Sequence, residues 1–318
     1  MSMKSIVLTG ATSLIGLALI RNYCNEYEIH ALVRPGSSRS KIIGNYPNVD
    51  VHEYELKDIR QSAGEIGEAD YFIHLGWDSS FENSRYNDEG QERNVTTTME
   101  SAMLADSLSC ESFIGMGSQA ECGRITTKIS ERTPSKPENA YGRAKEKAVI
   151  QSTIYCEEHG MKCIWPRLLS AYGPFDRKHT LLMSCISAWL DKRTINLTKC
   201  EQIWDYIYVD DVADATVRIM KKGKHGVRYP IASGNGRPLY EYLDILKELT
   251  NCPDELLKMG GRDYSEDQVM NLVGDISSLR RDTGFVPKTT FNEGIQKTID
   301  WVISGGEEVG DSGHPLLQ

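Results

Sequence analysis

The sequence predicts an α/β fold in which helices cover both faces of one parallel, doubly wound β-sheet. Short β-branched runs alternate with helical segments along most of the chain, which is typical of β-α-β units. A glycine-rich turn follows the first run, at the place where such sheets bind a nucleotide. The 318 residues, 40% hydrophobic and 25% charged, suffice for one such domain with a smaller partner.

The expected elements follow one another as short apolar runs and longer amphipathic segments. Strands are expected at residues 5–9, 29–33, 69–75, 112–117, 162–166 and 204–209, and helices at 16–25, 94–107, 141–159 and 212–221. Parallel neighbours need crossover helices, and such crossovers are right-handed.

Two stretches depart from this alternation. The segment from Leu169 to about Ile203 loses it, and the pattern from Gly236 to near Ile303 is mostly helical. We therefore expect a Rossmann-type doubly wound parallel sheet with a smaller, discontinuous C-terminal substrate lobe. The nucleotide-binding domain is expected at residues 1–168 plus 204–235 and the lobe at 169–203 plus 236–303, with a polar, disordered tail at 304–318.

The composition argues against several classes of protein. A formal charge of −9 argues against a broad basic surface for nucleic acid. No apolar run is long enough for a membrane helix, and the N-terminus does not read as a signal peptide. The eight scattered cysteines, without a C-x-x-C pair, indicate reduced thiols in a cytoplasmic protein, and no cluster has metal-ligand spacing.

The first expected strand runs into the turn GATSLIG, residues 10–16. Such a turn places backbone N–H groups and a helix N-terminus against a pyrophosphate. Gly10 permits the tight turn, and Gly16 lets the helix pack closely on the sheet. Ser13 replaces a middle glycine, and its hydroxyl can donate to a phosphate. The alternative is a purely structural βα turn.

The second strand ends at Val33, and Arg34 follows it. An NAD site usually has an acidic residue here, whereas an arginine suits the 2′-phosphate of NADP. Arg34 is the better candidate to bind this phosphate, and Arg39 could assist it. The alternative is a solvated loop arginine.

Tyr141 and Lys145, in YGRAK, lie at the start of the long expected helix. Residues four apart share a helix face, so the lysine ammonium is expected to lower the pKa of the phenol. Tyr141 would then donate or accept a proton near neutral pH. Ser118 lies just past the end of an expected strand, where ligand crevices form, and its hydroxyl could hold a carbonyl oxygen. An ordinary turn serine is the alternative.

At this point the chain resembles the extended short-chain dehydrogenase/reductase family, in the branch of NAD(P)-dependent nucleotide-sugar epimerases, dehydratases and ketoreductases. The resemblance runs from Lys4 to about Trp301. It depends on TGATSLIG, residues 70–75 followed by Gly76, Asn94-Val, GSQAECG, YGRAK, PRLLSAYGP, DYIYVDDVA and the ending GFVPKTTFNEGIQKTIDW.

The resemblance implies a Ser118/Tyr141/Lys145 triad, in which Lys145 also bonds the nicotinamide ribose. The expected cofactor-binding residues are Gly10, Thr12, Ser13, Leu14, Ile15, Gly16, Arg34, Arg39, Leu75, Gly76, Trp77, Tyr141, Lys145 and Leu168. The expected substrate-binding residues are Ser118, Gln119, Tyr141, Ser170 and Trp204. The family commonly dimerises through the Tyr-Lys helix, so a homodimer is expected.

Departures from the family pattern narrow the function. Dehydratases carry an Asp-Glu pair where this chain has Gln119 and Ala120, so 4,6-dehydration is not expected. Ser170 replaces an asparagine of R-x-x-N-x-Y-G-P, and Trp204 replaces an arginine that often meets the substrate phosphates. A core tryptophan is the alternative for Trp204. The candidates for another phosphate-binding arginine are Arg237, Arg262 and Arg280.

Three functions are compared. The leading hypothesis is an NADPH-dependent reductase of a nucleotide-linked keto-deoxy sugar at C4, with Tyr141 as general acid. The second is a nucleotide-sugar epimerase that uses bound NAD(H). The third, a non-catalytic NADP(H)-binding sensor, is disfavoured because the Tyr-Lys pair is present.

Overall fold

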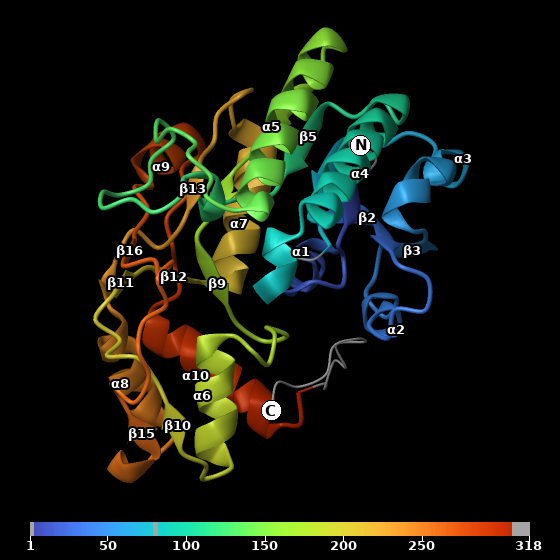
Figure 1. Cartoon of the computed structure of the whole chain (residues 1–318). Coiled ribbons are helices and arrows are strands. Elements are labelled where there is room, and N and C mark those ends of the chain that lie inside the picture. The colour runs from blue at the N-terminus through green and yellow to red at the C-terminus, as the bar shows by residue number, and fades with distance from the viewer. Residues whose placement is uncertain (1–2, 79–81, 307–318) are drawn as a thin grey trace.

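The computed structural model describes residues 3–78 and 82–306 and is built around a six-stranded parallel sheet (Figure 1). The strands lie in the order β3-β2-β1-β4-β5-β7. They are β1 (Lys4–Thr9), β2 (Tyr27–Val33), β3 (Val49–Glu53), β4 (Tyr71–His74), β5 (Ser112–Gly115) and β7 (Lys162–Ile164). After β3 the chain crosses to β4 on the other side of β1, so the order reverses there, and ligands bind at such reversals.

Two helices cover each face of this sheet. On one face α1 (Leu14–Tyr23) packs against α7 (Val209–Lys222), and on the other α4 (Asp88–Ser107) packs against α5 (Ala140–Glu158). Ile6 and Leu8 of β1 belong to the apolar core beneath α1, while Val7 belongs to the core beneath α4 and α5. A strand buried on both faces reads as a continuous apolar run, which is why the sequence pattern located it.

Short elements connect this framework. They are α2 (Ser40–Ile43), η1 (Leu56–Ser62), α3 (Ala63–Ile66), η2 (Glu82–Tyr86), β6 (Gly117–Ser118) and η3 (Gln119–Glu121). β6 pairs with β8 (Arg167–Leu168), which pairs with β13 (Pro230–Ile231). This small parallel sheet begins where β5 ends, and it carries Ser118.

A second group of helices lies below the sheet in Figure 1, where α6 (Leu181–Leu190) packs on α8 (Leu239–Leu249) and α8 on α10 (Phe291–Ile303). Short strands accompany them in pairs or threes: β9 (Ser170–Tyr172), β10 (Ile195–Asn196), β11 (Ile203–Trp204), β12 (Tyr206–Tyr208), β14 (Arg237–Pro238), β15 (Leu257–Lys258) and β16 (Asn271–Leu272). The remaining elements are η4 (Asp254–Leu256) and α9 (Ser277–Thr283).

The fold class predicted from sequence is confirmed, and five of the expected strands and all four expected helices are found within a few residues. The sixth strand, expected at residues 204–209, is divided at Asp205. Its buried carboxylate accepts N–H groups from Ser233, Gly234 and Gly274, which ties the chain to two loops at that point.

The expectation of a mostly helical pattern after Gly236 is wrong for residues 250–276, where Pro253 and the pair Gly260-Gly261 disfavour helix. The domain boundaries stay a prediction. Of the expected tail, residues 307–318 lie outside the described residues.

Candidate functional site

The glycine-rich turn fits closely against the loop that follows β4. Gly10 has a φ of +67°, and a Cβ there would lie 2.8 Å from the carbonyl carbon of Leu75. A Cβ on Gly16 would lie 2.4 Å from the Gly10 carbonyl oxygen. Ser13 caps α1 by accepting the Gly16 N–H at 3.1 Å, and its own hydroxyl proton can still be donated. The other expected residues of the turn, all half-buried, are Thr12, Leu14 and Ile15.

Buried polar groups hold the first part of the loop after β4. The Thr9 hydroxyl oxygen accepts the backbone N–H groups of Leu75 and Gly76 at 3.2 and 3.1 Å. Thr9 also contacts His74 Nδ1 at 2.9 Å, and His74 Nε2 lies 3.2 Å from the Thr98 hydroxyl. Burial lowers the pKa of His74 to about 3, so the ring is neutral in this chain of hydrogen bonds.

Trp77 and Asp78, further along that loop, are tied to α4. Asn94 accepts the Asp78 N–H and donates to the Asp78 carbonyl, both at 2.8 Å. The indole N–H of Trp77 donates to Gln91 Oε1 at 3.0 Å. Residues 75–78 are therefore held in place opposite the glycine-rich turn, as a cofactor cleft requires.

The two arginines predicted to bind the 2′-phosphate of the cofactor have different surroundings in the structure. Arg34 directly follows β2, its side chain is 67% exposed, and its guanidinium is 4.0 Å from the Asp78 carboxylate. Arg39 donates to the Thr12 carbonyl at 2.7 Å and lies over the Phe175 ring. Arg39 is thus part of the turn's own structure, whereas a phosphate can reach the guanidinium of Arg34.

Tyr141 and Lys145 lie in the first two turns of α5, which Asn139 caps by accepting the Gly142 N–H. The Lys145 ammonium donates to the Met116 carbonyl at 2.7 Å and lies 3.6 Å from the Trp77 ring centroid. The Tyr141 ring meets Trp77 edge to face at 6.0 Å. The helix thus carries both side chains to the end of β5 and to the loop after β4.

Ser118 lies at the end of β6, close enough to Tyr141 to affect the pKa of its phenol. The expected lowering of the Tyr141 pKa by Lys145 is wrong in this structure. Burial raises the Tyr141 pKa, and the Ser118 side chain and the charge of Arg85 oppose that rise only in part. Lys145 Nζ is 6.0 Å from the Tyr141 ring centroid and is bonded elsewhere, which accounts for its small effect on the phenol.

Burial is also the main cause of the pKa shift of Lys145, whose side chain is buried, with the residue 5% exposed. It lowers the pKa of the ammonium to about 7, and the negative charge of Glu121 opposes this. The lysine therefore titrates near neutral pH, while Tyr141 remains a protonated phenol.

The residues expected to bind substrate form two groups. In the first group Gln119 follows Ser118 directly, and Leu168, which was expected in the cofactor site, lies beside Ser118 in the register of β6 and β8. The second group joins Ser170 and Trp204, because the indole N–H donates to the Ser170 hydroxyl at 3.0 Å. Ser170 and Trp204, the two residues that depart from the family pattern, are therefore hydrogen-bonded to each other.

Arg237 is paired with Trp204 across the antiparallel strands β11 and β14. Directly opposed residues in such a pair project to the same face. Arg262 and Arg280 are exposed on other segments. Of the three candidate arginines, Arg237 is therefore the one placed beside Trp204. Cys122, just after η3, is buried in an apolar cluster.

Several residues that hold this site were not predicted from the sequence. The Arg85 guanidinium lies 5.0 Å from the Tyr141 ring centroid, and no local pattern indicated it. Glu121 and Arg167 form a buried ion pair next to Ser118. A signal for Glu121 was present, because S-x-x-E is the capping-box pattern and Ser118-Gln-Ala-Glu121 matches it.

All eight cysteines are free thiols with buried side chains. Among residues 3–78 and 82–306, no group of three His, Cys, Asp or Glu side chains is arranged to hold a metal ion. Within the same ranges, every helix is too short or too polar to cross a membrane.

Comparisons with known proteins agree with this geometry. The model of the family described as NAD dependent epimerase/dehydratase family matches residues 6–232. The chain is 26% identical over 300 residues to CDP-abequose synthase of Salmonella muenchen, a match that covers 93% of this chain and 97% of that one.

Two solved structures share the fold. A UDP-N-acetylglucosamine 4-epimerase of Methanobrevibacter ruminantium M1, in complex with UDP-N-acetylmuramic acid, has a TM-score of 0.86 at 20% identity, covering 96% of this chain and 99% of that one. A dTDP-glucose 4,6-dehydratase of Streptomyces venezuelae, solved with NAD bound, has a TM-score of 0.85 at 18% identity, covering 94% and 97%.

Proposed function

The chain belongs to the NAD dependent epimerase/dehydratase family, and we propose that it is an NADPH-dependent reductase of a nucleotide-linked keto-deoxy sugar, acting at C4. The observation that carries this proposal is the placement of Ser118 and Tyr141 close together, beside buried Lys145. A tyrosine whose pKa is raised keeps its proton at neutral pH. It therefore suits the general acid that a carbonyl reduction needs.

Each residue of this group has one role in the proposed reaction. The Ser118 hydroxyl orients the sugar carbonyl, and the Tyr141 hydroxyl gives its proton to the oxygen that becomes an alcohol. Lys145 holds the ribose of the cofactor. A bound nicotinamide cofactor supplies the hydride.

The residues around the glycine-rich turn fit a dinucleotide. A Cβ at Gly10 would fill the space beside the loop after β4, and α1 directs its N-terminal N–H groups toward the same place. We assign Arg34 to the 2′-phosphate, because its guanidinium is exposed at the end of β2. This assignment favours NADPH over NADH.

Dehydration and epimerisation are less well supported. Gln119 and Ala120 stand where a dehydratase has its acid and base, and the nearby Glu121 carboxylate is occupied by the Ser118 N–H and by Arg167. An epimerase would use the same Ser118, Tyr141 and Lys145 with bound NAD, and the exposed Arg34 at the end of β2 favours NADPH and net reduction instead.

The nucleotide end of the substrate would meet β11 and β14. One relative that the chain matches over nearly its whole length is named for a CDP-linked sugar. Arg237 offers a charge for the diphosphate, and Trp204, held by Ser170, offers a flat surface for a base or sugar.

We also propose a cytoplasmic homodimer. The eight free thiols fit a reducing compartment. Ile150 and Ile154, one turn apart on α5, are 47% and 51% exposed and suit an interface between two copies. Light scattering on purified protein tests the dimer, and a mass of one chain would refute it.

The test of function is oxidation of NADPH, and separately of NADH, with CDP-, dTDP-, UDP- and GDP-linked 4-keto-6-deoxy sugars. We expect NADPH to be consumed with at least one of them, and Tyr141→Phe to lower kcat by about 100-fold or more. Tyr155→Phe, on the same helix, is the control and should retain activity. Turnover by Tyr141→Phe, or sugar interconversion without net oxidation of NADPH, would overturn the proposal.

A further inference from the structure

A buried carboxylate touches the backbone of Ser118. Glu121 Oε1 accepts the Ser118 N–H at 2.7 Å, and Glu121 Oε2 accepts Arg167 Nε at 3.1 Å. The side chains of Glu121 and Arg167 are 0% and 1% exposed. Burying two charges costs hydration free energy. A buried ion pair therefore persists only where both groups make well-oriented hydrogen bonds.

Arg167 is anchored at its far end as well. It donates to the Thr133 carbonyl at 2.7 Å and to the Ser135 hydroxyl at 2.8 Å. Ser135 in turn donates to Glu146 at 2.6 Å, and Arg228 pairs with the same carboxylate.

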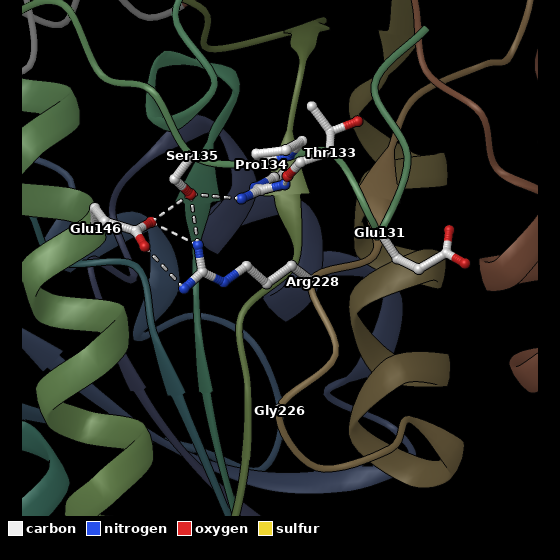
Figure 2. Close-up of a pocket in the computed structure, with 8 residues that line it drawn as sticks. Glu131, Thr133, Pro134, Ser135, Glu146, Gly226 and Arg228 are labelled. Atoms are coloured by element: carbon white, nitrogen blue, oxygen red, sulfur yellow. Dashed lines mark hydrogen bonds and ion pairs between the residues drawn. The ribbon is translucent and has the colours of Figure 1, made fainter.

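Figure 2 shows Ser135, Glu146 and Arg228 converging between α5 and the segment before β13 that carries Arg228. These residues line a cavity of about 380 Å³. Glu146 directly follows Lys145 on α5. The network therefore connects the Ser118 turn with the helix that carries Tyr141 and Lys145.

The backbone around Ser118 is shaped to admit this carboxylate. A Cβ on Gly117 would lie 2.6 Å from Glu121 Oε1 and 2.9 Å from the Pro166 carbonyl oxygen. Any side chain at residue 117 would push the carboxylate away from the Ser118 N–H. The Ser118 hydroxyl completes the capping box by accepting the Ala120 N–H at 3.2 Å.

We propose that Glu121 is a positioning residue, which fixes the turn at Ser118 so that the serine hydroxyl faces Tyr141, and that Arg167 holds Glu121 in that role. This inference rests on the proposed function, in which Ser118 orients the substrate carbonyl. The competing explanation is that the ion pair only stabilises the fold.

Two double variants separate these explanations. Glu121→Met/Arg167→Met and Glu121→Gln/Arg167→Met both remove the ion pair without leaving a single buried charge. They differ in one respect: the glutamine oxygen can still accept the Ser118 N–H, and methionine cannot. Glu146→Gln is the control, because it breaks the outer part of the network and leaves residue 121 unchanged.

We expect the Met/Met variant to have a kcat about 100-fold below that of the Gln/Met variant, since a displacement of about 1 Å can cost that much. The NADPH dissociation constants of the two should agree within about twofold, because the glycine-rich turn lies elsewhere. Glu146→Gln should stay within about fivefold of the unchanged protein. Equal kcat values for the two double variants would overturn the inference.

Repeating the comparison in a Ser118→Ala background distinguishes failure of this inference from failure of the proposed function. If Glu121 acts through the Ser118 hydroxyl, the difference between the double variants disappears there. A difference that persists would overturn the inference alone. If Ser118→Ala itself has unchanged turnover, the role of Ser118 in the proposed function is wrong.

Discussion

Replacing Lys145 with methionine should change how the stability of the protein depends on pH. The ammonium is 5% exposed, and burial lowers its pKa from 10.5 to about 7. Because the folded-state pKa lies below the unfolded one, the unfolded chain binds more protons between these two values. The lysine's contribution to folding stability therefore rises with pH across this window and is lost as pH falls toward 7.

The size of the effect follows from the shift. At about 1.36 kcal/mol for each pH unit, the complete window corresponds to about 5 kcal/mol, and the part between about pH 7 and 9 to about 2–3 kcal/mol. Lys145→Met abolishes this dependence. Lys147→Met removes a lysine from the same helix whose side chain is 46% exposed, so it should leave the dependence intact.

The measurement is the free energy of unfolding in urea, at several pH values between 6 and 9, for the unchanged protein and both variants at equal cofactor content. We expect the stability difference between the unchanged protein and Lys145→Met to grow in favour of the unchanged protein as pH rises. Parallel curves for Lys145→Met and Lys147→Met would refute the reasoning.

Two further outcomes are expected. Arg34→Ala should weaken NADPH binding by about tenfold and leave NADH binding unchanged, because only NADPH carries the 2′-phosphate. Fluorescence titration measures both dissociation constants, with Arg60→Ala as the control. Equal weakening of NADPH and NADH binding would contradict the assignment of Arg34. Asn94→Leu should cost about 2 kcal/mol of stability, since it removes both hydrogen bonds to the Asp78 backbone. Urea denaturation checks this against exposed Thr96→Val, and equal stability of the two variants would show that the bonds contribute nothing.

Local spacing located the parts of the site that lie within one element. The turn from Gly10 to Gly16 and the pair Tyr141 and Lys145 each belong to one turn or helix, so their geometry follows from sequence separation alone. The main strands were likewise visible, because burial on both faces makes them continuous apolar runs.

Contacts between distant segments could not be read from the sequence. Glu121 and Arg167 are 46 residues apart, and Trp204 and Ser170 are 34 apart, so only the assembled sheets bring them together. The direction of the Tyr141 pKa shift was missed for the same reason, since burial is a property of the packed chain. β3 was not expected, because VDVHE is short and has only two apolar residues, neither of which is fully buried at this edge of the sheet.

In the proposed substrate site, the hydrogen bond between Trp204 and Ser170 has a consequence for how substrate preference can evolve. A change at either position alone leaves an indole N–H or a hydroxyl without its partner, at a cost of about 1 kcal/mol or more. Substitutions at the two positions are therefore epistatic. A lineage that acquires one substitution must tolerate a less stable protein until the second substitution restores the stability. Libraries that aim to redirect this enzyme toward other sugars should randomise the two codons together.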